Sequence, residues 1–496
     1  MHSCAALLRV GRSIGLQGRR PASSNSQLKT IRRPSGSGRI GIFKGFNVAL
    51  SRLAVAAFAL AAVGAGAPAL AKDFTITVWS GGTSDPEHHR VDNIKLAAEQ
   101  LQREAQAEGK DLKIKIDARV FNDWDSFKQA FTLAAQSKTG PNIVVSGHED
   151  IAAWSQAGLL RPVEEFVDLD SWPLNAIFPN LTRSAKFNNV TYGLPQDAEA
   201  RPLFAWIPHL KAIGWSDAGI ASLPDRIGKG QYTLYDMLAD AKKMQDKGVV
   251  APGYGFYPRN LNGPDFWQFY IAFGGEMFDP KSAKLVFDQA AMTKFYKFFA
   301  DAVAMGVTKK NHIGLPSDQW YADVASGKAG FWHGGTWHYA RYTGKEKLKD
   351  FFGTVQFALI PAGEKGGKPT TLTHPLVYLI TKQGSDDDAN IAAQLVTIAS
   401  EPRFNVLHAV SSAHLAISEA ETRIPLYADN RWASEATKRL LPSAMSLPND
   451  AKLGTYWDLM WNGLLAAWTG DKSPETAVRD AAAEAKSRLG DAIVVR

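Results

Sequence analysis

Cysteine is almost absent from this chain. Its 496 residues include one cysteine, Cys4, near the amino terminus. A single cysteine excludes an internal disulfide and the thiolate clusters that hold structural zinc. The chain must therefore depend on its hydrophobic core for stability. The 425 residues that follow residue 71 are ample for such a core and exceed one ordinary domain, which favours two lobes.

Long hydrophobic runs are also missing. The uncharged apolar run Leu53–Val63 has 11 residues, whereas a membrane-spanning helix needs about 20. The run follows basic residues and precedes the small-residue pattern Ala-Leu-Ala at 69–71. This order predicts a signal peptide cleaved after Ala71, and it favours export over the alternative of a membrane anchor. We therefore expect residues 1–71 to be a preface followed by a signal peptide, with no lipid anchor, because no cysteine follows the cleavage site.

Acidic residues are absent from residues 1–71, which contain ten lysine and arginine residues. The whole chain has a formal net charge of +7, so residues 72–496 on their own carry −3. The basic character belongs to the leader. The charge of the remaining chain therefore gives no support for a nucleic-acid partner.

Residues 72–496 lack the common motifs of catalysis and nucleotide binding. They contain no P-loop, no dinucleotide fingerprint, no G-x-S-x-G elbow and no H-E-x-x-H pair. His333 and His338 are five residues apart, a poor spacing for one helical face, so we expect no metal site and no cofactor. The adjacent acids Glu149 and Asp150 leave a secreted carbohydrate-active enzyme as a remote alternative, since paired carboxylates can hydrolyse glycosides.

Strands and helices alternate after the leader. The expected strands cover residues 73–82, 111–121 and 141–147, and the expected helices cover 90–109, 125–140 and 149–160. Apolar alternation marks the strands, and apolar residues at helical spacing mark the helices. This order predicts an α/β lobe with a largely parallel sheet. Further helices are expected over 234–248, 290–306, 386–402 and 473–490, and further strands over 352–363 and 375–382.

Six segments resemble, in order, the family 1 extracellular solute-binding proteins of ABC importers, the maltose-binding-protein-like group that binds sugars in the periplasm. The most recognisable is GPNIVVSGHEDIAAWSQAGLLRPVEEF, residues 140–166, a strand followed by a helix and Gly-Leu-Leu. The others are ITVWSGG (76–82), YGLPQDAEARPLFAWIPHLKAIGW (192–215), TLYDMLADAKKM (233–244), ASGKAGFWHGGTWHYARY (325–342) and the block 456–485. Each segment is weak alone, but six in order span nearly the whole chain.

The resemblance implies an α/β, two-lobed periplasmic-binding-protein fold of type II-like topology. Each lobe is expected to be a mostly parallel sheet flanked by helices, with hinge segments between the lobes. We expect residues 72–195 with about 379–425 to form the N-terminal lobe, and residues 196–378 with about 426–496 to form the C-terminal lobe. The family implies a monomeric periplasmic protein, not an enzyme, that passes its solute to inner-membrane permease subunits.

Ligand-binding residues are suggested by the resemblance together with the local sequence. Trp337 matches the family's cleft tryptophan and follows two glycines that let backbone approach a ligand, although it could be a core residue. Glu149 and Asp150 follow an expected strand end but could instead cap a helix, and Arg201 could instead pair with a neighbouring acid. The candidates are Gly81, Gly82, Thr83, Glu149, Asp150, Gln196, Asp197, Glu199, Arg201, Asn262, Asp265, Trp267, Gly335, Trp337, His374 and Trp457.

A small carbohydrate, from a monosaccharide to an oligosaccharide or polyol, is the solute that we expect. A sugar presents hydroxyls at its edge and apolar C–H patches on its faces, which suit fixed polar groups and flat aromatic rings. Arg201, Arg259 and Arg341 leave an anionic solute open, such as a glycerophosphodiester or a sugar acid. The reason is that guanidinium groups bind phosphate and carboxylate well.

Overall fold

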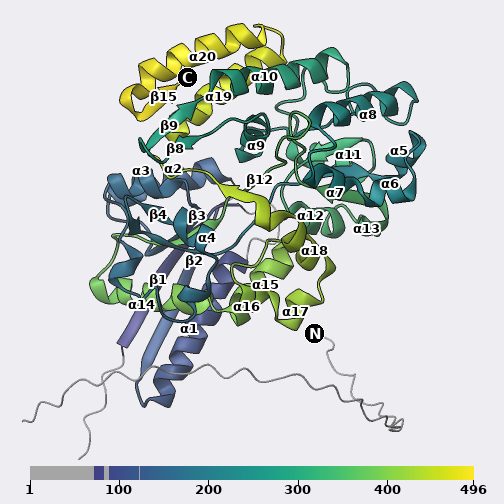
Figure 1. Ribbon diagram of the computed structural model, residues 1–496. Coiled ribbons are helices and arrows are strands. Elements are labelled where there is room, and N and C mark those ends of the chain that lie inside the picture. Colours follow the sequence, from purple (N-terminus) through teal and green to yellow (C-terminus); the bar gives the residue numbers. More distant parts are fainter. Residues whose placement is uncertain (1–71, 83–88, 122) are drawn as a thin grey trace, which may run out of the picture. The chain divides into compact units, whose positions relative to one another are not determined.

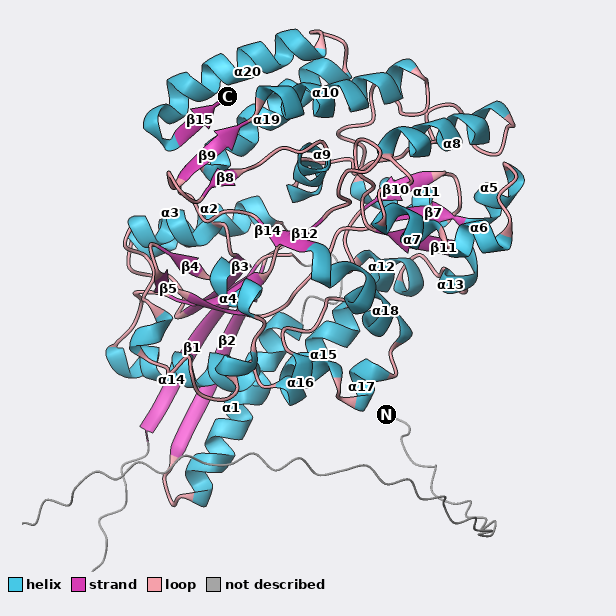
Figure 2. Ribbon diagram, in the orientation of Figure 1, coloured by secondary structure: helices cyan, strands magenta, loops and turns pink. Residues whose placement is uncertain are grey.

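The computed structural model describes residues 72–82, 89–121 and 123–496. The preface and signal peptide expected over residues 1–71 lie outside this range. Within the described residues, no helix is both long enough and apolar enough to cross a membrane. Helices and strands alternate along the first part of the chain, and helices predominate in the rest (Figures 1 and 2).

Five strands form the first sheet, in the order β2-β1-β3-β13-β6. Strand β1 (Lys72–Ser80) pairs in parallel with β2 (Leu112–Val120) and β3 (Ile143–Gly147). Strand β13 (Leu376–Ile380) pairs antiparallel with β3 and with β6 (Gly193–Pro195). The strands expected over 73–82, 111–121, 141–147 and 375–382 are confirmed.

Side chains of this sheet alternate between two hydrophobic cores. Ile143 and Val145 pack in the core that includes helix α1 (His89–Ala107), whereas Val144 packs in a second core with α2 (Trp124–Gln136) and α3 (Asp150–Gln156). Successive side chains of a strand point to opposite faces, so a strand covered on both faces has a continuous apolar run. Helices α14 (Asp386–Ala399) and α15 (Pro402–Ser412) pack against α1.

Three strands form the second sheet, in the order β10-β7-β11. Strand β7 (Leu203–Trp206) pairs antiparallel with both β10 (Phe331–His333) and β11 (Val355–Ala358). The expectation of a mostly parallel sheet in each lobe is wrong here. Parallel neighbours need a strand-helix-strand crossover. The chain between β7 and β10 contains several helices and two strands that pair in another sheet, so these two strands are not joined by a simple crossover.

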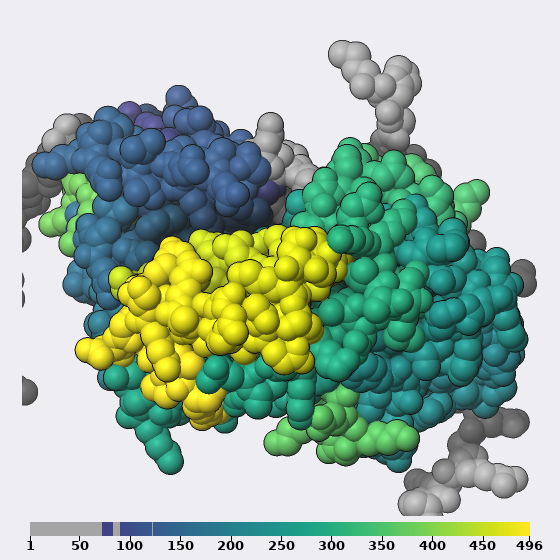
Figure 3. Space-filling view, turned by 90° about the horizontal axis from the view of Figure 1, so that it is seen from above, coloured from purple at the N-terminus to yellow at the C-terminus, as the bar shows by residue number. Residues whose placement is uncertain are grey.

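Three long helices pack together in the C-terminal part of the fold. Helix α10 (Gln289–Ala304) packs against α19 (Leu453–Trp468) and α20 (Pro474–Leu489), and the C-terminal segment, yellow in Figure 3, forms one continuous surface. The helices expected over 234–248, 290–306, 386–402 and 473–490 are confirmed. The strand expected over 352–363 is only β11, because Asp350 caps a short helix α13 (Phe351–Thr354) in front of it.

The other α-helices and β-strands of the described residues have the following bounds. The helices are α4 (Pro179–Ser184), α5 (Ile207–Ala212), α6 (Asp217–Ala221), α7 (Leu223–Gly228), α8 (Leu234–Asp246), α9 (Trp267–Ala272), α11 (Ser317–Ala325), α12 (His338–Gly344), α16 (Glu419–Thr422), α17 (Pro425–Ala428) and α18 (Arg431–Leu440). The strands are β4 (Lys186–Phe187), β5 (Val190–Thr191), β8 (Phe278–Asp279), β9 (Lys284–Phe287), β12 (Thr371–Thr373), β14 (Ala444–Ser446) and β15 (Ile493–Val495).

Two crossing segments leave the first sheet and position the candidate site. The first, residues 196–202, joins β6 to β7 of the second sheet. The second, residues 371–375, contains β12 and leads into β13. Strand β12 also pairs in parallel with β14. The two segments adjoin the paired strands β6 and β13, so their polar side chains lie close together at the end of the first sheet.

Candidate functional site

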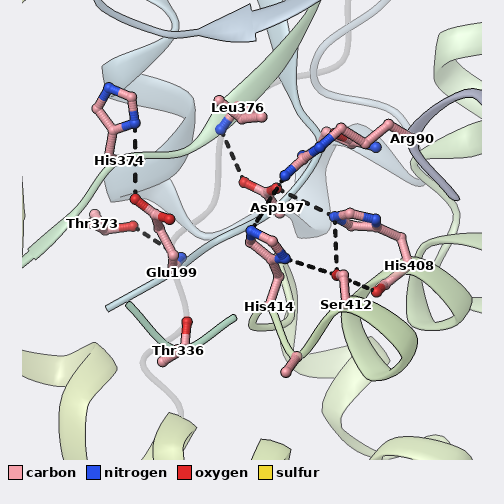
Figure 4. Close-up of polar contacts among 12 residues, drawn as sticks. Arg90, Asp197, Glu199, Thr336, Thr373, His374, Leu376, His408, Ser412 and His414 are labelled. Carbon is pink, nitrogen blue, oxygen red and sulfur yellow. Dashed lines mark hydrogen bonds and ion pairs between the residues drawn. The ribbon is translucent and has the colours of Figure 1, made fainter. Parts of the chain in front are cut away.

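Charged side chains are buried on the first crossing segment. Asp197, Glu199 and Arg201 are each at most 5% exposed. Charged residues are almost never buried unless they are paired, so each of these groups needs a partner. Figure 4 shows partners of Asp197 and Glu199, which come from the second crossing segment and the start of β13, from α1 and from the region of α15.

Asp197 is the centre of the first group of contacts. Its Oδ2 lies 2.6 Å from Arg90 Nη1 and 3.3 Å from His408 Nε2, and the Leu376 N–H donates to its Oδ1 at 2.9 Å (Figure 4). Arg90 Nη1 also donates to Gln196 Oε1 at 2.7 Å. Burial acts to raise the pKa of Asp197, but the Arg90 guanidinium and nearby histidines outweigh it and hold the pKa far below its ordinary value.

Glu199 and Arg201 form the second group. Arg201 Nη2 donates to Glu199 Oε1 at 2.5 Å, and Arg201 Nη1 lies 3.9 Å from Asp265 Oδ1. The hydroxyls of Thr373 and Thr371 accept hydrogen bonds from the backbone N–H groups of Glu199 and Arg201, at 3.4 and 2.7 Å. The two crossing segments are therefore joined by side chains as well as by the first sheet.

The Glu199 carboxyl titrates near neutrality. Burial raises its pKa to about 7, although the positive charges of Arg201 and His374 oppose the shift. Burial acts in the opposite sense on His374, but the charge of Glu149 outweighs it and raises the pKa of His374. The candidate site therefore contains close ion pairs together with Glu199, a carboxyl group whose pKa lies near neutral pH.

Trp337 lies against these charged groups. The Arg201 guanidinium carbon is 4.9 Å from the centre of the Trp337 ring, and the His414 ring stacks on it at 5.8 Å with an angle of 11°. His414 Nε2 in turn lies 3.7 Å from Asp197 Oδ2, which links the first two groups. A Cβ on Gly335 would overlap the Trp337 ring, so glycine is required for this close approach.

Glu149 and Asp150 share a lysine. Lys128 Nζ lies 2.9 Å from a carboxylate oxygen of each, and Ser146 Oγ donates to Asp150 at 2.5 Å. Glu149 Oε2 lies 2.7 Å from His374 Nε2. Glu149 makes no side-chain capping bond to α3, so the alternative of a helix cap is wrong for this residue. Burial acts to raise the pKa of Glu149, but His374 and Lys128 hold it well below its ordinary value.

Three candidates lie apart from these contacts. The Trp457 indole N–H donates to Asn262 Oδ1 at 2.7 Å in a solvent-exposed pair. Trp267 is fully buried and packs edge-to-face on Tyr270 and Tyr456, which is a core position rather than the rim of a site. The Trp267 ring on α9 therefore packs against Tyr456 on α19.

The glycine loop after β1 is described in part. Gly81 and Gly82 follow β1 at the edge where β3 also ends, since Ser80 pairs with Val145. A side chain on Gly81 would overlap the ring of Trp124, so this glycine is explained by packing. Thr83 lies outside the described residues.

The other two arginines of the anionic alternative differ in availability. Arg341 is paired with Asp318 at 2.6 Å and with Glu346 at 2.9 Å. Arg259 Nη1 lies 3.1 Å from His338 Nε2. Arg341 is therefore committed to acids of its own region, whereas Arg259 contacts His338 and also interacts with Tyr321 and with the charge of Asp265.

Ser412, His414 and Asp197 have the composition of a hydrolase triad. Ser412 Oγ lies 2.7 Å from His414 Nδ1, and it donates to the His408 carbonyl oxygen at 2.6 Å (Figure 4). Ser412 is 1% exposed. A nucleophile must reach its substrate, so this buried serine favours a structural role over catalysis.

The sequence reasoning missed several members of the site. Arg90, Lys128, His148, His408 and His414 lie outside the expected ligand positions, and Arg90 meets His414 across 324 residues of sequence. The only available signal was a charged or imidazole side chain within an otherwise apolar stretch, as in the segment 404–417. Local patterns do not encode which distant residue is the partner.

Two groups of described residues have the composition and spacing of metal ligands. One is His148 with Glu149 and His374, and the other is Asp197 with His408 and His414. In each group the ligand atoms lie within 4.8 Å of one another.

Comparison with known families gives one match over most of the chain. Residues 93–403 match the family described as bacterial extracellular solute-binding protein. Among curated proteins, a putative binding protein of Brucella abortus (strain 2308) is 22% identical over 370 residues, which cover 74% of this chain and 84% of the relative. A putative binding protein of Brucella suis biovar 1 (strain 1330) matches equally well.

Solved structures share the fold at low sequence identity. Maltose-bound T. maritima MalE3 superposes with a TM-score of 0.67 and 19% identity, covering 83% of this chain and 99% of that one. A solute-binding protein of Thermotoga lettingae bound with α-D-tagatose gives 0.66 and 19%, over 84% and 100%. A substrate-binding protein of Listeria monocytogenes in complex with cycloalternan gives 0.67 and 14%, over 84% and 99%. The two-lobed α/β fold expected from the sequence is confirmed.

Proposed function

Because this chain belongs to the family of bacterial extracellular solute-binding proteins, we propose that it is the solute-binding component of an ABC importer. It captures a small carbohydrate in the periplasm, from a monosaccharide to an oligosaccharide or polyol, and delivers it to inner-membrane permease subunits. It acts as a monomer, it does not bind nucleic acid, and it does not alter the bonds of its solute. Its scaffold is the two-lobed α/β fold.

The convergence of candidate residues on the crossing segments carries this proposal. Trp337 is partly exposed and lies beside Arg201, which is paired with Glu199. An aromatic face flanked by fixed charged groups suits a sugar ring, because the face takes the C–H patch and the polar groups take the hydroxyls. The polar groups are held by their own partners, so little ordering is needed when a solute arrives.

Closure about the crossing segments is the proposed mechanism. The proposed lobes are residues 72–195 with about 379–425, and residues 196–378 with about 426–496. Glu149 and Asp150 belong to the first lobe, and Arg201 and Trp337 to the second. Solute contacts from both lobes exist together only in the closed state, so binding shifts the population towards it.

An anionic solute, such as a sugar acid or a glycerophosphodiester, is the second candidate. Arg201 favours it, because its Nε and Nη1 are buried and have no hydrogen-bond partner among the described residues. Arg259 supports it with a buried guanidinium that lies 3.1 Å from the His338 imidazole, although Tyr321 and the charge of Asp265 also act on this group. Guanidinium groups form paired hydrogen bonds with carboxylate and phosphate, whereas Glu199 and Asp265 beside Arg201 favour an uncharged solute.

A thermal-shift screen tests both candidates. The panel contains monosaccharides, oligosaccharides, polyols, sugar acids and glycerophosphodiesters. A solute at 100 times its dissociation constant should add about 2.7 kcal/mol to the free energy of unfolding. Trp337→Ala should abolish the shift for a neutral sugar, whereas Trp172→Ala should not, because Trp172 is 59% exposed and lies outside the site.

The outcomes separate the alternatives. A shift confined to anions and lost in Arg201→Gln would move the assignment to the second candidate. Silence across the panel would remove the assignment of a carbohydrate. Mass spectrometry of the recovered solute checks the remote enzymatic alternative, since a hydrolysed product would contradict a pure binding protein.

A further inference from the structure

We propose that His148, Glu149 and His374 bind a single Zn²⁺ ion. One imidazole nitrogen of each histidine and one Glu149 oxygen lie within 4.8 Å of one another. His148 and Glu149 follow β3, whereas His374 follows β12 on the second crossing segment. The backbone N–H of His148 donates to the backbone carbonyl oxygen of Pro375 at 3.2 Å, so the main chain already holds the two segments together.

His148 has a free nitrogen in a buried position. Its side chain is fully buried, its Nε2 lies 3.1 Å from the Leu447 carbonyl oxygen, and its Nδ1 has no hydrogen-bond partner among the described residues. A carbonyl oxygen only accepts, so Nε2 carries the proton and Nδ1 presents a lone pair. A buried polar atom without a partner is costly and requires an explanation, such as an ion.

Each of the three ligands also has an outer partner. His148 Nε2 donates to Leu447, Glu149 Oε1 lies 2.9 Å from Lys128 Nζ, and His374 Nδ1 lies 3.8 Å from Glu199 Oε1. Metal-binding histidines usually donate their second N–H to a carbonyl or carboxylate, which fixes the tautomer and the orientation of the ring. The cluster therefore has one such outer hydrogen bond, at His148, and charged neighbours beside the other two ligands.

The contact between Glu149 Oε2 and His374 Nε2 is where the ion would enter. These atoms are 2.7 Å apart, whereas two ligands of a tetrahedral ion at about 2.0–2.1 Å are roughly 3.3 Å apart. A small rotation suffices, and the His374 proton passes to solvent as the ion binds. The His374 and Glu149 side chains are 13% and 15% exposed, which leaves a route for the ion.

Zinc is the metal that suits these ligands. Two imidazoles and one carboxylate are a common set for Zn²⁺ when a fourth position is left open for water or a substrate oxygen. A solute hydroxyl or carboxylate could take that position, because Glu149 and His374 are candidate ligand residues. The site itself does not rest on the proposed function, but it revises the expectation that the chain holds no metal.

The second histidine group provides a contrast. Asp197, His408 and His414 offer the same kinds of ligand, but the Arg90 guanidinium lies 2.6 Å from Asp197 Oδ2 and 3.3 Å from His414 Nε2. In this group the guanidinium occupies the ligand atoms themselves, because it bonds the Asp197 oxygen that faces both histidines, and its fixed charge repels a divalent cation. Lys128 in the first group instead bonds Glu149 Oε1 and leaves Oε2 to face His374. We therefore assign the ion to the first group and not to the second.

Zinc titration by calorimetry tests the assignment on protein first treated with EDTA and freed of it. We expect one equivalent to bind, and His148→Ala and His374→Ala each to weaken binding at least tenfold. His209→Ala and His414→Ala should leave it unchanged. Titration with Co²⁺ should produce visible absorption bands of a tetrahedral site, and these bands should disappear in Glu149→Gln. Circular dichroism of each variant confirms that it is folded.

Three results would overturn the assignment. They are no zinc binding at 100 µM, binding that survives both His148→Ala and His374→Ala, and binding that is lost in His414→Ala but not in His374→Ala. The titration contains no solute, and the solute screen can be run in EDTA. A failure of the zinc site can therefore be distinguished from a failure of the proposed transport function.

Discussion

Glu421 is a carboxyl group with no exposed surface. Asn405 Nδ2 and the Ile417 N–H donate to its Oε2, at 3.1 and 3.0 Å. Burial raises its pKa to about 8, because an ionised carboxylate loses its hydration there, and the charge of Asp197 adds to the shift while the two hydrogen bonds oppose it. The folded protein therefore prefers the protonated acid at neutral pH.

Glu421→Gln should raise the free energy of unfolding at pH 9 and change it little at pH 4. An acid with a raised pKa in the folded state stabilises the protein below about pH 4.5, and this contribution is lost as the pH rises through about 8. The difference between the two pH values should be roughly 3–5 kcal/mol, at 1.36 kcal/mol per pKa unit. Urea unfolding of both proteins measures it, and equal stabilities at pH 9 would contradict the burial of an ionisable carboxyl.

Asp197 supplies the counter-charge of the buried Arg90. In Asp197→Asn, the amide oxygen can still accept from the Leu376 N–H, but the buried Arg90 loses its counter-charge. Breaking a buried pair on one side costs roughly 3–5 kcal/mol, so we expect a loss of that size in urea unfolding at pH 7.

The matched control is Asp387→Asn. Asp387 pairs with Lys72 at 3.1 Å, and both side chains are more than 60% exposed. Exposed pairs contribute about 0–1 kcal/mol. A loss in Asp197→Asn no larger than that of the control would show that Arg90 finds another partner or reaches water.

Helix α14 depends on one residue for its start. Ser385 Oγ accepts from the Asp388 N–H, and the Asp388 side chain accepts from the Ser385 N–H, which is a capping box. Ser385→Ala should cost about 1 kcal/mol of stability, whereas Ser385→Gly should cost only a few tenths. Urea unfolding compares the two, and equal losses would mean that the hydroxyl does not hold the helix end.

Elements were predictable from sequence because their signals are local. The alternation in residues 111–121 and the helical spacing in residues 290–306 specify β2 and α10 without knowledge of the rest of the chain. The strand expected over 352–363 is longer than β11 at both ends, and at its start the Asp350 cap places residues 351–354 in helix α13 instead. A single capping residue thus outweighed the apolar pattern.

Local motifs marked only part of the candidate site. Glu149, Glu199 and Trp337 lie in segments that resemble the family, and the structure brings them to the crossing segments. Their partners Arg90, His408 and His414 were missed, because each contact joins residues far apart in sequence. A buried charged residue requires a partner, but the sequence does not show which distant residue that partner is.

At the scale of the whole molecule, the resemblance gave the two-lobed fold, and local reasoning could not have given the strand order. Strand β13 enters the first sheet between β3 and β6, and both pairings are antiparallel. The second sheet is antiparallel throughout, contrary to expectation. The direction of a strand depends on how the chain returns to the sheet. After a long connection the chain can return in either direction, so the local sequence does not determine it.

A solute that bridges both lobes should make the molecule more compact as well as more stable. The radius of gyration should fall and then level off once all molecules are bound, because closure ends when the lobes meet. The free energy of unfolding should keep rising, from about 2.7 kcal/mol at 100 times the dissociation constant to about 4.1 kcal/mol at 1,000 times. Small-angle X-ray scattering and urea unfolding on the same samples separate the two effects. A rise in stability at an unchanged radius of gyration would place the solute on one lobe and contradict hinge closure, since contacts to a single lobe give no reason for the other to move.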